Sequence, residues 1–304
     1  MREYGIPYKG SKNTIAEDVV NALPPGGKIL DACCGGGAVL MALAMSMKYD
    51  AVVGNDLNKA VVKLLDAVLI NKGQIEYEHP KPCSRNDFFV SLQKIENGDF
   101  DIQDCVNKFC ASFGNDGKTY LYGRDVEDYK LTAERMLTAD NLETRRKFYR
   151  KFVEICEKKD RINELQFLQR IQNLERLERL ERLDVLVRLE NKSIFEIDYS
   201  EFDIVYFDIP YKGTNKYDFD FDYERFYKLF TYLKTDLKIP AFLSEYNAPF
   251  TCVAEFEKAQ LMAASVGSTK STTMEKLYFN GSKEEYKELM GKNYNQKTEQ
   301  MVLL

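Results

Sequence analysis

Residues 205–213, VYFDIPYKG, combine residue types that can hold an amino group. Pro210 cannot donate to a strand ladder, so the apolar run must stop near Asp208. The Asp208 carboxylate and the Ile209 carbonyl, which the fixed φ of Pro210 holds in place, give two acceptors for the two donors of an NH₂ group. Tyr211 adds a ring on which a planar base can stack. The same residues also fit a turn that ends a strand on an incidental acid.

A second candidate site is the glycine turn within residues 30–39, LDACCGGGAV. Gly35 and Gly37 let the backbone approach a ligand closely, although a dinucleotide fingerprint would need glycine where Leu40 stands. Asp56 ends the next apolar run about 20 residues further on, where an acid can accept from ribose hydroxyls. These residues predict a cofactor that carries adenosine but no pyrophosphate. Close packing of a strand on a helix would explain the glycines alone.

Alternating strand and helix patterns position both candidate sites. Residues 28–34 and 51–58 have strand patterns, and each is followed by a helical pattern. Strand patterns return at 193–198, 203–208, 239–247 and 275–280. This order predicts an α/β fold with a doubly wound parallel sheet. The ends of its strands then meet at one edge, where ligands bind.

The residues between these patterns are polar, charged and helix-prone, and they predict an inserted helical domain. We expect residues 1–72 and 192–304 to form one α/β domain and residues 73–191 to form a largely helical insertion in it. Within the insertion, residues 173–191 are expected to form one helix, because Glu175 and Arg179 are spaced as an i,i+4 ion pair. Leucine occurs there at every third position, at 174, 177, 180, 183, 186 and 189. This period winds around a helix, so the repeat also fits a low-complexity spacer.

Residues 144–152, TRRKFYRKF, concentrate positive charge in a chain whose net charge is −5. Five basic residues occur here: Arg145, Arg146, Lys147, Arg150 and Lys151. On a helix the pairs Arg146 and Arg150, and Lys147 and Lys151, lie on adjoining faces, and the segment can contact DNA phosphates. A solvated helix face is the alternative interpretation.

The bulk composition excludes several classes of protein. No segment approaches the ~20 apolar residues of a membrane span, and the first residues lack a secretory pattern. Seven cysteines without a CxxC pair argue against a disulfide framework, and the single histidine, His79, excludes a zinc site built on several histidines. We therefore expect a cytoplasmic protein that binds neither metal nor membrane.

Taken in order, the motifs resemble those of the Dam-type (D12 class) DNA adenine-N6 methyltransferases. DIPY fits the signature of methyltransferases that act on amino groups, and PYKGSK at 7–12 is similar to the family's N-terminal aromatic–Gly–Lys element. DACCGGGAV matches its glycine motif, and FLSEYN matches a later strand. The resemblance covers about residues 4–70 and 190–280. Ala32, Cys33 and Ile209 depart from the commonest pattern, in which proline, phenylalanine and proline stand.

The resemblance implies a Rossmann-like, S-adenosylmethionine-dependent methyltransferase domain with a mostly helical inserted recognition domain. It also implies double-stranded DNA as partner, and we expect a monomer. The implied catalytic residues are Asp208, Ile209, Pro210 and Tyr211. The implied cofactor-binding residues are Tyr8, Lys12, Asp31, Cys33, Gly35, Gly37, Asp56 and Asp198. Two alternatives stay open: a methyltransferase for cytosine N4, RNA or a protein amide, and a catalytically silent DNA-binding or assembly protein.

Overall fold

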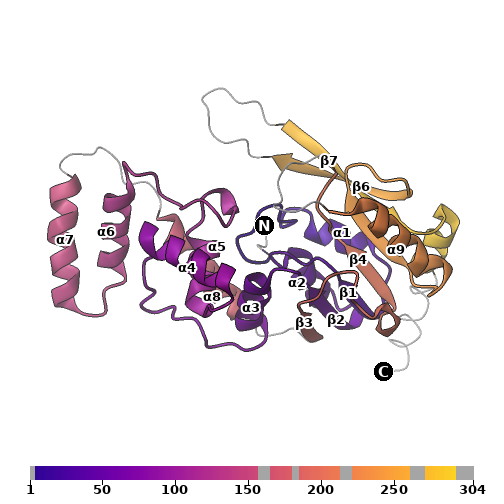
Figure 1. The fold of residues 1–304 in the computed structure, drawn as a ribbon, viewed down its shortest axis with the longest axis horizontal. Helices are drawn as coiled ribbons and strands as arrows, with labels where there is room; N and C mark the ends of the chain where they lie inside the picture. Colours follow the sequence, from indigo (N-terminus) through magenta and orange to yellow (C-terminus); the bar gives the residue numbers. More distant parts are fainter. Residues whose placement is uncertain (1–3, 157–164, 180–184, 213–220, 261–270, 292–304) are drawn as a thin grey trace. The chain divides into compact units, whose positions relative to one another are not determined.

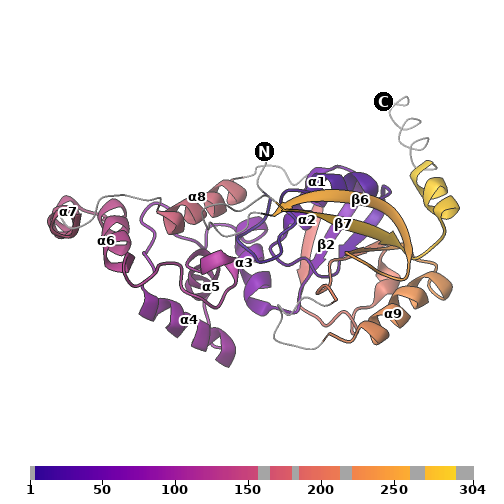
Figure 2. The same ribbon diagram turned by 90° about the horizontal axis from the view of Figure 1, so that it is seen from above.

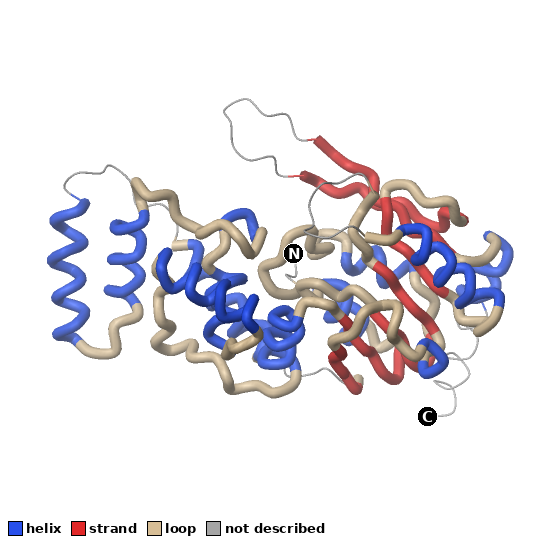
Figure 3. The backbone as a smooth tube through the Cα atoms, viewed as in Figure 1, coloured by secondary structure: helices blue, strands red, loops and turns tan. Residues whose placement is uncertain are grey.

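The structure is a computed structural model that describes residues 4–156, 165–179, 185–212, 221–260 and 271–291. The chain divides into two compact units. The sheet unit comprises Met1–Tyr4, Lys12–Asn58 and Arg182–Leu304, and the helical unit comprises Gly5–Ser11 and Lys59–Glu181. Figure 3 shows the strands in the first unit and most of the helices in the second.

The sheet unit is built on a seven-stranded sheet with the order β3-β2-β1-β4-β5-β7-β6. The strands are β1 (Gly26–Asp31), β2 (Tyr49–Asn55), β3 (Leu186–Glu190), β4 (Ile204–Phe207), β5 (Ala241–Glu245), β6 (Thr251–Gln260) and β7 (Ser271–Phe279). The first five pair in parallel, whereas β7 is antiparallel to both β5 and β6 (Figures 1 and 2). The predicted α/β class is confirmed.

Helices of the sheet unit bury the strands. In the described residues they include α1 (Ala16–Ala22), α2 (Ala38–Met45) and α9 (Tyr223–Thr235), the short 3₁₀ turn η2 (Tyr199–Glu201) and a helical segment at 283–291. Phe226, Phe230 and Leu233 of α9 are fully buried in one core with Val205 and Phe207 of β4. These α9 positions recur at i, i+4 and i+7, so they form one helix face. Each side chain of this kind contributes roughly 1.5–3 kcal/mol when it is buried.

Helix α2 packs closely on the sheet because residue 54 of β2 is a glycine. A Cβ atom there would lie 2.8 Å from Leu40 of α2 and 2.9 Å from Leu189 of β3. Residues Ala38–Ala44 of α2 are all buried, so the helix needs close contact on every side. Gly54 thus brings the helix that follows the glycine turn against the strand that precedes Asp56.

The described residues of the helical unit form seven short elements. They are α3 (Lys59–Leu69), α4 (Arg85–Asn97), α5 (Ile102–Cys110), η1 (Phe113–Asn115), α6 (Glu127–Leu137), α7 (Leu142–Cys156) and α8 (Gln166–Glu178). Capping boxes begin α4, with Ser84 and Asp87, and α5, with Asp101 and Asp104. Each box satisfies backbone donors that a helix start leaves unpaired. No helix in the described part of the chain is long and apolar enough to cross a bilayer.

The expected helix over residues 173–191 is wrong. Helix α8 ends at Glu178, and Leu186–Glu190 form β3, which pairs in parallel with β2. Leu174 and Leu177 are buried in α8, whereas Leu186 is 74% exposed; Leu180 and Leu183 lie outside the described residues. The three-residue leucine period makes no helical stripe, and the edge of β2 offers backbone partners that local sequence does not reveal.

Residues 193–198, which have a strand pattern, are also not a strand. They form a turn that leads into η2, and Ile194 and Ile197 anchor this turn in the apolar core. The apolar residues at this position serve core packing rather than strand pairing. Two strands, β3 and β6, are missing from the sequence-based prediction.

Candidate active site

Three carboxylates lie at one edge of the sheet. Asp31 is the last residue of β1, Asp56 follows the end of β2, and Asp208 follows the end of β4. The three strands are parallel neighbours in the order β2-β1-β4. Their carboxyl ends therefore share the edge at which α/β sheets bind ligands.

The glycine turn and Asp56 are joined directly. Gly35 and Gly37 have φ angles of 48° and 77°, which residues other than glycine rarely adopt. The Gly35 N–H donates to Asp56 Oδ2 at 2.9 Å, and the Asn58 N–H donates to Asp56 Oδ1 at 2.8 Å. Burial raises the pKa of Asp56, and these two donors oppose the rise. The turn thus orients the Asp56 carboxylate toward the sheet edge.

Asp31 is buried and lacks a donor. Its side chain is 1% exposed, and neither carboxylate oxygen has a hydrogen-bond partner among the described residues. Burial raises the pKa of Asp31 well above its usual value, the charges of Asp208 and Asp56 add to the rise, and Lys12 and the nearby Cys33 backbone N–H oppose it. A buried polar group without a partner is costly, so this carboxylate suits a cationic ligand.

Lys12 lies at the centre of a buried network of charged and polar groups. Its Nζ is 2.6 Å from Asp208 Oδ1 and 3.0 Å from Glu275 Oε1. It also donates to the Tyr211 hydroxyl at 2.6 Å, and this hydroxyl donates to Glu275 Oε1 at 2.7 Å. Burial alone would lower the pKa of Lys12, but Asp208 and Glu275 more than offset that effect and raise it. The lysine is therefore cationic at neutral pH.

The backbone of the DIPY segment is held from several sides. The Ile209 side chain is buried in the core of the sheet unit, which leaves its carbonyl as the group available for chemistry. The Tyr223 hydroxyl of α9 donates to the Pro210 carbonyl at 2.8 Å. The Tyr211 ring meets the ring of Tyr246 edge-on, with centroids 4.7 Å apart. These contacts hold the Ile209 side chain, the Pro210 carbonyl and the Tyr211 ring in place.

Two buried acids at this edge were missed by sequence reasoning. Glu275 of β7 is fully buried, and Glu245 ends β5 and is 1% exposed. Glu245 accepts from the backbone N–H groups of Tyr246 and Lys212. The alternation of side chains along a strand could have revealed Glu275. It shares a face of β7 with Leu277 and Phe279, which are both buried. An acid on the apolar face of a strand indicates a functional or paired group.

Three other predicted cofactor residues have different surroundings. Cys33 lies near Asp56 and Asp31. Burial raises the pKa of its thiol, and the charges of these two residues raise it further. Asp198 is exposed and accepts from the Ser200 N–H at 3.1 Å, which caps η2. Tyr8 belongs to the helical unit, where its ring centroid lies 6.1 Å from that of Phe109. Contacts of Asp198 and Tyr8 with a cofactor stay predictions.

The five predicted DNA-contacting residues all lie on α7 in the helical unit. Their side chains are exposed: Arg145, Arg146, Lys147, Arg150 and Lys151. Phe148 and Phe152 lie three and seven residues after Arg145, so Arg145 is on their side of α7 and the other four cations are on the remaining side. Phe152 stacks on Tyr129 of α6 at 5.3 Å. The helix thus presents an apolar stripe to its neighbour and a basic face to solvent.

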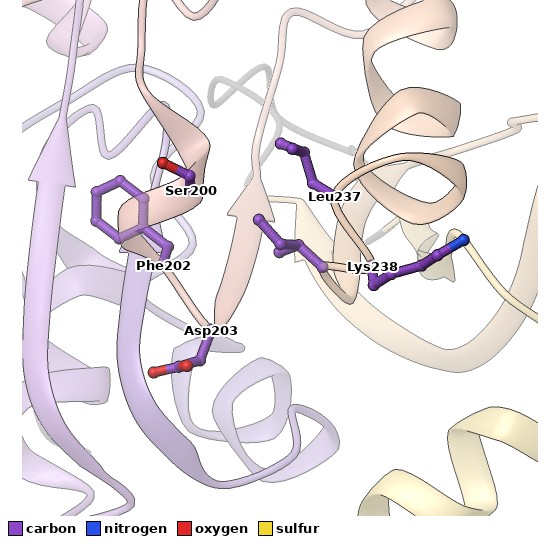
Figure 4. Close-up of a pocket in the computed structure, with 6 residues that line it drawn as sticks. Ser200, Phe202, Asp203, Leu237 and Lys238 are labelled. Carbon is purple, nitrogen blue, oxygen red and sulfur yellow. The ribbon is translucent and has the colours of Figure 1, made fainter.

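A cavity of about 300 Å³ lies away from the acidic edge. Its lining residues precede β4 and β5, at the opposite ends of these strands from Asp208 and Glu245 (Figure 4). They are Ser200, Phe202, Asp203, Leu237, Lys238 and Ile239. In the part of the chain that the structure describes, no cluster of His, Cys, Asp and Glu is arranged to hold a metal ion.

Comparisons with known proteins identify the family. No curated protein matches the chain. Two solved structures of the rRNA methyltransferase aviRa from Streptomyces viridochromogenes are similar, with 14% and 15% identity, over 88% of this chain and 83% of that chain. Their TM-scores of 0.35 and 0.36 support no further conclusion. The family model for D12 class N6 adenine-specific DNA methyltransferase matches residues 8–289. Because this match spans most of the sequence, the chain belongs to that family, as the motifs predicted.

Proposed function

We propose that this chain methylates the N6 amino group of an adenine in DNA at the acidic sheet edge. The position of Asp208 supports its role in binding the amino group. Asp208 directly follows β4, beside Asp31 at the end of the neighbouring strand β1. An amino group held at Asp208 therefore lies next to groups suited to a cationic methyl donor. Membership of the D12 class of N6 adenine-specific DNA methyltransferases supports adenine N6 as the group that is methylated.

The residues at this edge fit S-adenosylmethionine. Asp31 offers a buried carboxylate with unused acceptor capacity, which suits the ammonium group of the cofactor. Asp56 accepts from Gly35 and Asn58, and each carboxylate oxygen has a further lone pair for a ribose hydroxyl. When bound, S-adenosylmethionine supplies a methyl group on a sulfonium that an amine can attack. Gly35 and Gly37 keep the turn clear of side chains.

Asp208 and Ile209 hold and activate the amino group. The target adenine must leave the duplex, which costs a few kcal/mol, because its amino group is otherwise paired. The Asp208 carboxylate and the Ile209 carbonyl accept the two N6 hydrogens and draw the nitrogen lone pair out of the ring. Tyr211 stacks on the base, which contributes roughly 1–3 kcal/mol. The proton released after transfer passes to Asp208 or to water, so no histidine is needed.

The basic face of α7 contacts DNA phosphates. Arg146, Lys147, Arg150 and Lys151 lie on this face, and Arg145 is exposed beside it, in a chain whose net charge is −5. Phosphate contacts supply affinity and orientation without reading bases, so this face does not set the target sequence. Clustered lysine and arginine on one helix give the local positive field that such contacts need.

Mass analysis of treated DNA tests the proposal. Adenine-unmethylated DNA is incubated with the protein and S-adenosylmethionine, digested to nucleosides and analysed. N6-methyladenine is the expected product. Methylation of cytosine instead, or of added RNA but not DNA, would replace the proposed substrate, and absence of any transfer by a folded protein that binds the cofactor would contradict the activity.

A further inference from the structure

Glu275 is a buried carboxylate that lies outside the motifs of the chain. It stands on β7, an antiparallel strand near the edge of the sheet, and its side chain is fully buried. Its Oε1 lies 3.0 Å from Lys12 Nζ and accepts from the Tyr211 hydroxyl at 2.7 Å. One oxygen atom therefore contacts both the lysine that pairs with Asp208 and the tyrosine of the DIPY segment.

We infer that Glu275 is a positioning residue for methyl transfer, which holds Lys12 and Tyr211 so that Asp208 can receive the substrate amino group. This inference rests on the proposed function. Lys12 and an incoming N6 group compete for the same Asp208 carboxylate. Glu275 gives the ammonium a second anionic partner, so Lys12 stays in place when Asp208 turns to the substrate.

The rigidity of β7 makes Glu275 suited to this role. Residues of β7 pair with β5 on one side and with β6 on the other, and Leu277 and Phe279 on the same face are buried. Lys12 instead precedes α1, and its long side chain can move about its four-carbon stem. A fixed carboxylate beside a flexible cation determines where that cation rests.

The Tyr211 contact serves the orientation of the base. The hydroxyl of Tyr211 bonds both Lys12 and Glu275, and its ring meets Tyr246 edge-on. Anchors at the hydroxyl and along the ring fix the plane on which the base stacks. A small misplacement of reacting groups lowers rates by up to about 10²-fold, so the effect of this anchor falls on kcat.

Glu275→Gln tests the inference, because glutamine keeps the volume and one acceptor but cannot form the ion pair. Steady-state methyl transfer gives kcat and KM for DNA, and calorimetry gives the Kd for S-adenosylmethionine. We expect kcat to fall by about 10–100-fold while the cofactor Kd changes by less than about threefold. The matched control is Glu255→Gln on the paired strand β6, where the acid is exposed and 3.6 Å from Lys276. This control should keep the wild-type kcat.

The outcomes separate the inference from the proposed function. A Glu275→Gln variant with kcat within about twofold of wild type overturns the role of Glu275, whereas loss of transfer in Asp208→Ala still supports the proposed function. Full activity of Asp208→Ala contradicts the proposed function itself. If circular dichroism shows that Glu275→Gln does not fold, Glu275→Asp replaces it, since it keeps the charge but shortens the reach. The aspartate variant should lose at least about fivefold in kcat, and a wild-type value overturns the inference.

Discussion

Lys12 and Asp208 are separated by 196 residues in the chain, yet their side chains form an ion pair of 2.6 Å. Lys12 belongs to the N-terminal PYKGSK motif and Asp208 to the DIPY motif. The pair is shielded, because the lysine side chain is 4% exposed and the aspartate side chain 21% exposed. The two motifs therefore act as one electrostatic unit.

Replacing Lys12 with methionine should destabilise the protein and slow methyl transfer. The change leaves Asp208 and Glu275 without their buried cation, and breaking such a pair typically costs about 3–5 kcal/mol. The free energy of unfolding in urea at pH 7 measures this cost. Lys94→Met is the control, because Lys94 is 48% exposed and pairs with Asp104 at 3.3 Å. The control should lose no more than about 1 kcal/mol, and equal losses would argue against the buried network.

Asp31→Asn should stabilise the ligand-free protein and weaken cofactor binding. Burial raises the folded-state pKa of Asp31, so the folded protein holds a proton that the unfolded chain releases above about pH 4. Stability is therefore lost as the pH rises toward the folded-state pKa. The amide removes this loss, so the variant's gain in melting temperature should grow from pH 4 to pH 8. Calorimetry should show weaker binding of S-adenosylmethionine, and unchanged affinity would contradict the proposed contact.

Glu134 of α6 predicts a second pH effect, in the helical unit. Burial raises the pKa of Glu134 to about 7, while the Tyr122 hydroxyl, which donates to its carboxylate, opposes the rise. Stability linked to this group is present below its unfolded pKa and is lost as the pH rises through 7, by about 3 kcal/mol in total. Glu134→Gln should flatten this dependence in urea unfolding between pH 4 and pH 8. An unchanged slope would show that Glu134 does not titrate in this range.

Removing two charges from α7 should weaken DNA binding and lower its salt dependence. Arg146 and Arg150 are exposed and one helical turn apart. Each lost phosphate contact reduces the magnitude of the slope of log K against log salt by about 0.9. The slope of the variant with both arginines changed to glutamine should therefore be smaller by about 2. Arg176→Gln on α8 with Arg179→Gln at its C-cap removes the same charge from another exposed part of the helical unit as a control. Equal slopes for the two variants, measured by fluorescence anisotropy, would exclude a specific role for α7.

The acidic edge was predictable from sequence because its parts are local. A glycine turn, an acid at a strand end and a proline two residues after Asp208 each mark the end of a strand, and parallel topology brings these ends together. The resemblance to the D12 class likewise rests on such short motifs, and the family match confirms it.

The strand β3 and the role of Glu275 could not be predicted in the same way. Residues 186–190 belong to the leucine repeat that predicted a helix, but they form a strand that pairs with β2. The role of Glu275 depends on its contacts with Lys12 and Tyr211, which lie far away in the sequence. In both cases the structure depends on residues that are distant in the sequence, and local propensity does not reveal such contacts.

The most direct test of the central claim is methyl transfer by Asp208→Ala together with its affinity for S-adenosylmethionine. Asp203→Ala is the matched control, because Asp203 precedes the same strand at its opposite end and accepts from the Lys28 N–H. We expect Asp208→Ala to lose N6-methyladenine formation by at least about 10²-fold while it still binds the cofactor, and Asp203→Ala to stay active. Full methylation by a folded Asp208→Ala variant would contradict the account.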